Sequence, residues 1–127
     1  MASLRDIMTS DVFTTTSDAS VVDAARGMAR GRFGSALVMN GSWLAGIITE
    51  RDVLRAAASG SDLNTVPVKE WMTADPVTSS PETDSEEAVG IMLANGFRHL
   101  PITEGISVLG IVSLRDVLSA RIRRRPR

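Results

Sequence analysis

The sequence contains two copies of one pattern at a constant spacing. Ile7–Asp11 returns as Trp71–Asp75, and Gly46–Leu54 returns as Gly110–Leu118. Both matches share one ungapped offset of 64 residues, as from Gly46 to Gly110. Neither small sheet is expected to bury both of its faces alone, so the two units should pack together and share a core. We therefore expect two similar units that form one fold.

The helices are predicted by apolar residues at helical spacing. Positions i, i+3, i+4 and i+7 form one stripe in each copy, which indicates an amphipathic helix. Polar pairs at capping distance precede both stripes and favour a helix start there. The stripes are Val21, Ala24, Ala25, Met28 and Ser85, Ala88, Val89, Met92, and the capping pairs are Ser20 with Asp23 and Asp84 with Glu87.

Two short apolar runs around a turn follow each predicted helix. The turn in the first copy is Asn40–Ser42, and in the second it is Glu104–Gly105. This pattern is typical of a hairpin. A short strand is expected near 12–14, and a closing helix after Thr49 and after Ser113. The order is β-α-β-β-α, twice, in an α+β fold whose two repeats pack about a pseudo-twofold axis.

The repeats set the expected boundaries. The first repeat covers residues 1–57 and the second 67–121, with a connection at 58–66 and a basic tail at 122–127. The connection is small and polar and contains Gly60, as expected for a loop. It is too short to separate two independent domains.

Composition excludes several classes of function. The chain has no cysteine and one histidine, so disulfides, thiolate metal sites and multi-histidine metal sites are not expected. Arg5 and Asp6 interrupt any signal-peptide pattern, and no stretch has the length of a membrane span. We expect a cytoplasmic protein without a membrane partner.

The charge of the protein indicates whether nucleic-acid binding is expected. The net charge of −1 argues against a protein that binds nucleic acid through its whole surface. The C-terminal end is locally basic, which allows two interpretations: a solvated chain end, or a contact to phosphates. Its arginines are Arg121, Arg123, Arg124, Arg125 and Arg127.

The residues best suited to bind a ligand stand at the end of the last strand in each repeat. A hydroxyl residue, Thr49 or Ser113, stands where the strand leads into a helix. Free N–H groups at a helix start favour an anion. Arg51 and Arg115, two positions on, suit a phosphate, and Asp52 and Asp116, three positions on, suit a ribose diol.

The same residues have a purely structural interpretation. Thr-x-x-Asp and Ser-x-x-Asp are also capping boxes, in which the hydroxyl and the carboxylate satisfy the N–H groups of the helix itself. Taken alone, each motif favours the cap.

The duplicated pattern resembles a known family. Met-Thr near the start, an Ala-rich helix ending in Met, a strand like Arg98–Ile102 and a closing Gly-Ile-Val-Ser-x-Arg-Asp are similar to a repeat of the cystathionine β-synthase (CBS) type. Two such repeats form a Bateman module. The resemblance covers about residues 4–57 and 67–121. Leu37 stands where the second repeat has Pro101, a departure that concerns structure and not the site.

The resemblance implies a binding module for AMP, ADP, ATP, S-adenosylmethionine or NAD-like ligands, which lie between the repeats. By position, one site would combine Ser113, Arg115 and Asp116 with Thr9, Phe13, Thr14, Gly34, Ser35 and Ala36. The other would combine Thr49, Arg51 and Asp52 with Thr73, Val77, Thr78, Arg98, His99 and Leu100. His99 suits either a ligand contact or a packing position. Trp43 and Trp71 are expected to pack or to lie in an interface.

The expected function is a stand-alone regulatory module whose homodimer changes shape on nucleotide binding and signals to an effector protein. The alternative is a nucleic-acid-associated protein that uses the arginine tail. An enzyme is not expected, because no nucleophile and base stand together. Candidate dimer residues, which are equally suited to an intramolecular core, are Ile7, Val53, Leu54, Val117 and Leu118.

Overall fold

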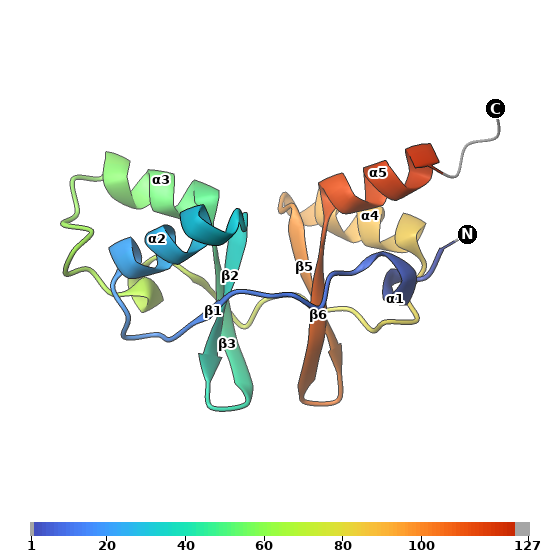
Figure 1. Cartoon of the computed structure of the whole chain (residues 1–127), viewed down its shortest axis with the longest axis horizontal. Coiled ribbons are helices and arrows are strands. Elements are labelled where there is room, and N and C mark those ends of the chain that lie inside the picture. Colours follow the sequence, from blue (N-terminus) through green and yellow to red (C-terminus); the bar gives the residue numbers. More distant parts are fainter. Residues whose placement is uncertain (1, 124–127) are drawn as a thin grey trace. The chain divides into compact units, whose positions relative to one another are not determined.

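The computed structural model describes residues 2–123 and contains two compact units (Figure 1). The first, here called the Asp52 unit, is the continuous stretch Val12–Pro76. The second, the Asp116 unit, combines Met1–Asp11 with Val77–Arg127. The chain therefore passes between the units twice.

The Asp52 unit is a four-stranded sheet covered by two helices. Strand order is β1-β2-β3-β4, with β1 parallel to β2 and the other pairs antiparallel. Helices α2 and α3 pack against each other and against the central hairpin (Figure 1). The elements are β1 (Thr14–Thr15), α2 (Val21–Gly31), β2 (Ser35–Asn40), β3 (Trp43–Thr49), α3 (Glu50–Ala58), the 3-10 helix η1 (Val68–Glu70) and β4 (Thr73–Ala74).

The Asp116 unit repeats this plan with fewer paired strands. Its antiparallel hairpin, β5–β6, has the same irregularity in register as β2–β3. Single bridges, Thr9 to Ile111 and Ser79 to Ile102, stand where β4 and β1 pair in the Asp52 unit. The elements are α1 (Leu4–Ile7), α4 (Ser85–Asn95), β5 (His99–Glu104), β6 (Ser107–Ser113) and α5 (Leu114–Arg123).

The predicted α+β order is confirmed. The first repeat has the full β-α-β-β-α sequence, whereas the leading strand of the second is reduced to the bridge at Ser79. The turns lie where expected, and each contains a glycine with positive φ, Gly41 at 60° and Gly105 at 61°. Such turns favour glycine because a side chain there is strained.

The stretch that leads into each repeat packs on the other repeat's unit. In the Asp116 unit the N–H of Leu4 donates to the carbonyl of Thr83 at 2.9 Å. In the Asp52 unit the N–H of Val68 donates to the carbonyl of Ala19 at 2.8 Å. These bonds lie at equivalent positions of the two copies. Leu4 and Val68 are fully buried, so each segment contributes to the core that it joins.

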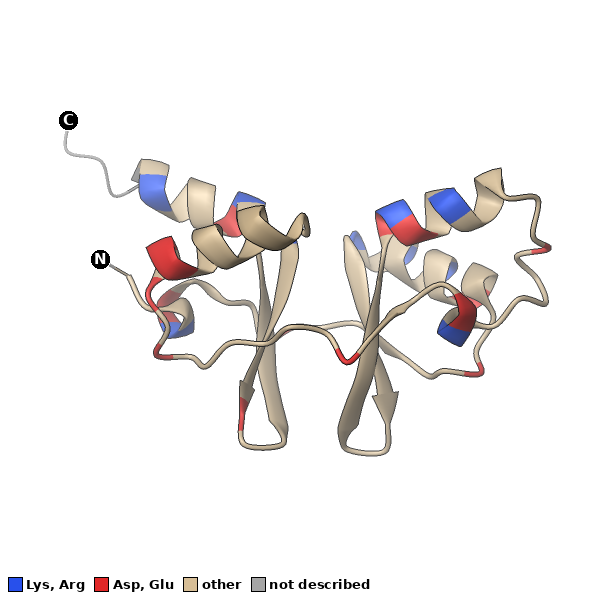
Figure 2. Ribbon diagram, turned by 180° about the vertical axis from the view of Figure 1, so that it is seen from behind, with Lys and Arg blue, Asp and Glu red and all other residues tan. Residues whose placement is uncertain are grey.

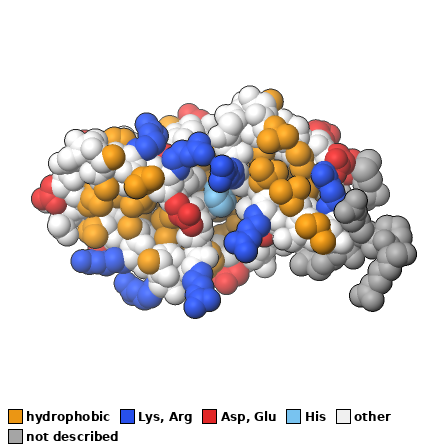
Figure 3. Space-filling view, turned by 90° about the horizontal axis from the view of Figure 1, so that it is seen from above, with side chains coloured by type: hydrophobic (Ala, Val, Ile, Leu, Met, Phe, Trp, Pro, Cys, Tyr) orange, Lys and Arg blue, Asp and Glu red, His pale blue; other side chains and the backbone are white. Residues whose placement is uncertain are grey.

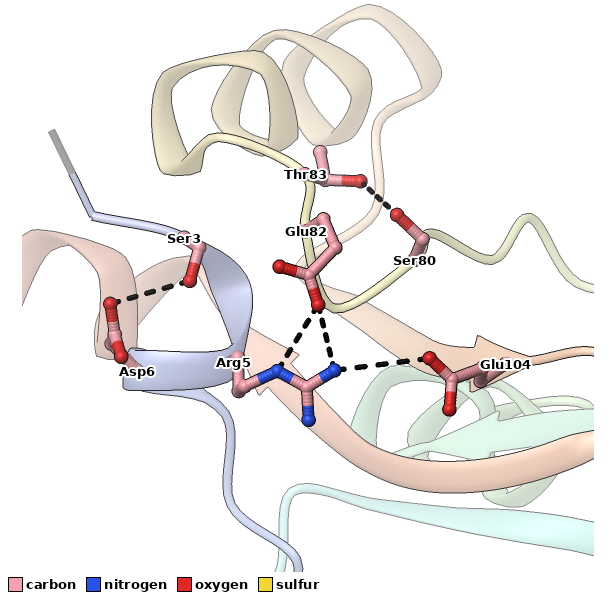
Figure 4. Close-up of polar contacts among 7 residues, drawn as sticks. All are labelled: Ser3, Arg5, Asp6, Ser80, Glu82, Thr83 and Glu104. Carbon is pink, nitrogen blue, oxygen red and sulfur yellow. Dashed lines mark hydrogen bonds and ion pairs between the residues drawn. The ribbon is translucent and has the colours of Figure 1, made fainter.

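An ion pair accompanies each of these segments. In the Asp116 unit, Arg5 from α1 reaches Glu82 at 2.7 Å and Glu104 at 3.8 Å (Figure 4). In the Asp52 unit, Lys69 reaches Asp18 at 3.0 Å. These side chains are at least half exposed, so the pairs orient the segments more than they stabilise them.

Each unit has its own apolar core, built on the predicted helix stripes. Val21, Ala24 and Met28 are buried in α2, and Ala88 and Met92 are buried in α4. They pack against apolar residues of the hairpins. The remaining buried members are Ala36, Val38, Ile48, Ala56 and Val68 in the Asp52 unit, and Leu4, Leu100, Ile102, Val112 and Val117 in the Asp116 unit.

The predicted caps differ between the two copies. Ser20 is the N-cap of α2, and its hydroxyl accepts from the N–H of Asp23 at 3.2 Å, as expected. Asp84 is the N-cap of α4, but its side chain makes no capping bond there. The predicted helix starts are therefore confirmed at both Ser20 and Asp84, and only Ser20 caps its helix through the side chain.

Two phenyl rings lie against glycines of α2. Phe13 and Phe33 stack with their ring centroids 5.9 Å apart. A Cβ atom at Gly27 would lie 2.0 Å from Cζ of Phe13, and one at Gly31 would lie 2.2 Å from Cε2 of Phe33. The two glycines, one helical turn apart, thus leave the space that the rings fill.

Candidate functional site

In the Asp52 unit, the strand-to-helix junction is a complete capping box. The N–H and the hydroxyl of Thr49 donate to Oδ2 of Asp52 at 2.9 and 3.1 Å. The N–H of Asp52 donates back to the hydroxyl of Thr49 at 3.4 Å. A third residue, Arg55, reaches Oδ1 of Asp52 at 3.3 Å. The carboxylate is thus held on both oxygens.

In the Asp116 unit, the junction keeps the two bonds that involve backbone N–H groups, without counterparts, among the described residues, of the hydroxyl-to-carboxylate bond and of the Arg55 contact. The N–H of Ser113 donates to Oδ2 of Asp116 at 3.0 Å, and the N–H of Asp116 donates to the hydroxyl of Ser113 at 3.0 Å. Within the described part of this unit, nothing donates to Oδ1 of Asp116. One carboxylate oxygen therefore stays open.

The capping interpretation of both motifs is confirmed as geometry. Each hydroxyl and each carboxylate satisfies backbone N–H groups at the start of α3 or α5. A cap and a binding site do not exclude each other, because a carboxylate has about four lone-pair positions and the cap uses only part of them. The ligand role of these residues stays a prediction.

Arginines lie beside both caps and point to solvent. Figure 2 shows acidic and basic residues together at the starts of α3 and α5, where Arg51 and Arg115 lie. Arg51, Arg98 and Arg115 are exposed and form no ion pair with a described residue of their own unit.

The remaining predicted residues range from exposed to fully buried. Thr9, Thr14, Thr73 and Thr78 are exposed, as is Val77 at 45%. Phe13, Gly34 and His99 are half-buried, and Ser35 is buried. Ala36 and Leu100 are fully buried and belong to the cores of their units. Phe13 packs against α2 through its ring.

The residues predicted for each site belong partly to one unit and partly to the other. Thr9 belongs to the same unit as Ser113, Arg115 and Asp116, and it pairs with Ile111 two positions before Ser113. Thr73 likewise pairs with Ile47 in the unit of Thr49, Arg51 and Asp52. The other predicted contacts combine residues from both units, and they stay predictions. They are Phe13, Thr14, Gly34, Ser35 and Ala36 for the first site, and Val77, Thr78, Arg98, His99 and Leu100 for the second.

Arg55 is a residue of this region that the sequence motifs did not single out. Its guanidinium lies over the ring of Trp71, 5.6 Å from the centroid, in addition to its contact with Asp52. The signal in the sequence is its position three residues after Asp52, one turn along the helix. Trp71 packs against the core of the Asp52 unit, whereas Trp43 is 56% exposed.

Large apolar side chains are open to solvent on the helices. Figure 3 shows such side chains gathered on the helical side of the Asp116 unit. Leu93 of α4 and Ile122 of α5 are exposed, as are two candidate dimer residues, Leu54 and Leu118. Val117 is buried in the core of its unit, so its intramolecular interpretation is correct.

Most of the predicted basic tail lies outside the described residues. Arg121 forms an ion pair with Glu86 at 2.5 Å, and residues 124–127 and the side chain of Arg123 are not described. Among residues 2–123, no helix combines the length and the apolar composition needed to cross a membrane.

Known proteins share this duplicated fold. The sequence pattern of the CBS domain matches residues 4–59 and again 68–123. A 17.7 kDa protein of Acidianus ambivalens is 40% identical over 119 residues, which cover 92% of this chain and 71% of that protein. The chain therefore belongs to the CBS domain family. It is a tandem CBS pair, a regulatory module.

Solved structures agree in fold. The hexameric CBS-CP12 protein from bloom-forming cyanobacteria has a TM-score of 0.89 and 30% identity, with 100% of this chain and 76% of that chain covered. The CBS domain pair of protein MJ0100, solved with 5′-methylthioadenosine and S-adenosyl-L-methionine, has a TM-score of 0.90 at 20% identity, with 98% and 99% covered. The latter likeness concerns the fold alone.

Proposed function

We propose that this protein binds an adenosine nucleotide, with Asp52 and Asp116 as acceptors for the ribose diol. The observation that carries the proposal is the pair of junctions at which a hydroxyl, an exposed arginine and a carboxylate meet at a helix start. Such a start favours anionic groups. The ligand is AMP, ADP or ATP in this proposal, with NAD and S-adenosylmethionine as related candidates.

Two further points support an adenosine ligand. The CBS pair of protein MJ0100 was solved with two adenosine compounds, methylthioadenosine and S-adenosyl-L-methionine. The arginines beside the caps, Arg51 and Arg115, have no competing ion pair within the described part of their units. They supply charge for a phosphate, to which the guanidinium is geometrically suited.

The proposed role of binding is regulation of another protein and not catalysis. We propose that ligand binding changes the population of two conformations of a homodimer, and that an effector protein recognises one of them. The exposed apolar residues Leu54, Leu93 and Leu118 support a dimer, because such side chains gain from burial. The related CBS-CP12 protein is a hexamer. No observation favours the nucleic-acid alternative.

Light scattering tests the dimer. A mass of twice 13.6 kDa is expected, and Leu118→Glu should reduce it towards 13.6 kDa. Ile106→Glu, at an exposed hairpin turn, is the control and should leave the mass unchanged. A mass of 13.6 kDa at all concentrations would contradict the dimer.

The substitution Asp116→Asn separates binding from capping. An amide keeps the shape and accepts at one oxygen only, so we expect AMP affinity at this site to fall by about 1.5–3 kcal/mol, the range for hydrogen bonds to a charged group. Calorimetry measures the affinity, and urea unfolding measures the cap. If stability falls by about 1 kcal/mol, as for a lost cap, while affinity stays the same, the carboxylate is a cap only.

A further inference from the structure

Asp52 and Asp116 hold equivalent positions but have different neighbours. Arg55 lies within 3.3 Å of Oδ1 of Asp52. The equivalent position in the second repeat is Ser119, which makes no hydrogen bond to Asp116. The oxygen that differs is Oδ1: it accepts from Arg55 at Asp52, and at Asp116 the cap leaves it open.

Arg55 is held in place by a second contact. Its guanidinium lies 5.6 Å from the ring centroid of Trp71, a cation–π arrangement. The equivalent of Trp71 is Ile7, which has no aromatic ring, so both parts of this arrangement are specific to the Asp52 unit. The side chain of Asp52 is 10% exposed beneath the arginine.

We propose that Arg55 is a specificity-determining residue that makes the two carboxylates unequal, so that a vicinal diol binds at Asp116 before it binds at Asp52. This inference rests on the proposed function. A diol donates two hydrogen bonds, and it is best matched by an acceptor whose second oxygen is open. At Asp116 that oxygen has no donor within the described part of the unit, whereas at Asp52 Arg55 already donates to it and competes with the diol.

The size of the effect follows from the exposure of Arg55. Its side chain is 62% exposed, so its pair with Asp52 belongs to the weak class of surface ion pairs. Such pairs contribute up to about 1 kcal/mol, which corresponds to roughly a fivefold change in affinity. Arg55 therefore lowers the affinity of the Asp52 site relative to the Asp116 site but does not prevent binding there.

A reciprocal exchange tests the proposal. Arg55→Ser gives the first junction the residue of the second, and Ser119→Arg does the reverse. The probe is adenosine, which has the diol but no phosphate, so a change in affinity does not reflect lost attraction between Arg55 and phosphate. The exchange at residue 55 is made in an Asp116→Asn background, so that only the Asp52 site keeps its carboxylate. The exchange at residue 119 is made in an Asp52→Asn background. NMR titration measures each affinity and shows whether the variant is folded.

We expect Arg55→Ser to strengthen adenosine binding at the Asp52 site by roughly fivefold, and Ser119→Arg to weaken binding at the Asp116 site. Binding of 2′-deoxyadenosine, which lacks the diol, should not change. The control Arg30→Ser removes an equally charged residue of α2 that has no ion pair with a described residue of its unit, and it should have no effect.

The outcomes separate this inference from the proposed function. Equal affinities at the two sites of the unsubstituted protein, or weaker binding in Arg55→Ser, would overturn the role of Arg55 and leave nucleotide binding intact. If neither adenosine nor AMP binds any of the proteins, the proposed function fails, and the inference fails with it.

Discussion

The side chain of Arg5 donates two hydrogen bonds to a single oxygen of Glu82, from Nε at 3.1 Å and from Nη2 at 2.7 Å. The hydrogen bonds to Glu82, followed by the charge of that carboxylate, raise the pKa of Arg5 above its ordinary value. Arg5 is protonated in any case at ordinary pH, so this shift adds no pH dependence near neutrality. The pair connects α1 to the loop before α4 (Figure 4).

The burial of Leu4, and not the ion pair of Arg5, should hold α1 in place. Leu4 is fully buried in the core of the Asp116 unit. We expect Leu4→Ala to lower the free energy of unfolding by about 2–5 kcal/mol, the range for a buried leucine. Arg5→Ala should cause a much smaller change, since both partners are at least half exposed. Urea unfolding compares the two, and equal losses would contradict this ranking.

A side chain at Gly27 should destabilise the protein. A Cβ atom there would meet the ring of Phe13 at 2.0 Å, so Gly27→Ala has to displace the stacked rings. The overpacking cost of about 1–3 kcal/mol should exceed the gain of about 1 kcal/mol in helix propensity. Gly90→Ala in α4 is the matched control, because nothing lies within 4 Å of its Cβ position. It should stabilise the protein, and the same sign in both variants would contradict the packing of Phe13.

Arg32 ends α2 in the left-handed conformation, with φ of 60°. The equivalent residue after α4 is Gly96, with φ of 74°. A residue with a side chain costs about 1–2 kcal/mol in this conformation, and glycine adds about 0.4–1 kcal/mol of entropy to the unfolded chain. Arg32→Gly should therefore raise the free energy of unfolding by about 0.5–1 kcal/mol. Gly96→Ala should lower it; a thermal melt that shows Arg32→Gly to be less stable would contradict this account.

Much of the fold is readable from local pattern. The stripe containing Val21, Ala24 and Met28 predicts α2 because helical spacing places these residues on one face. Gly41 and Gly105 predict the hairpin turns because those turns need positive φ. The physical cause of a helix or a turn of this kind lies within a short stretch of the sequence, so it can be predicted without knowledge of the rest of the fold.

Long-range packing is what local pattern does not contain. Leu4 and Val68 look alike in the sequence, and nothing near either residue indicates which unit it joins. The capping boxes were readable from Thr49 and Asp52, but the ion pair and ring contact of Arg55 depend on where Trp71 packs. The space for Phe13 depends likewise on Gly27, a residue fourteen positions away that carries no pattern of its own.

Isothermal titration with AMP, ADP, ATP, NAD and S-adenosylmethionine tests the central claim most directly. We predict a saturable heat with at least one of them at micromolar to sub-millimolar concentration, and a rise in thermal stability with the same compound. A ligand present at 100 times its Kd adds about 2.7 kcal/mol to the free energy of unfolding. No heat and no thermal shift with any of the five at millimolar concentration would contradict the claim that this CBS pair binds an adenosine nucleotide.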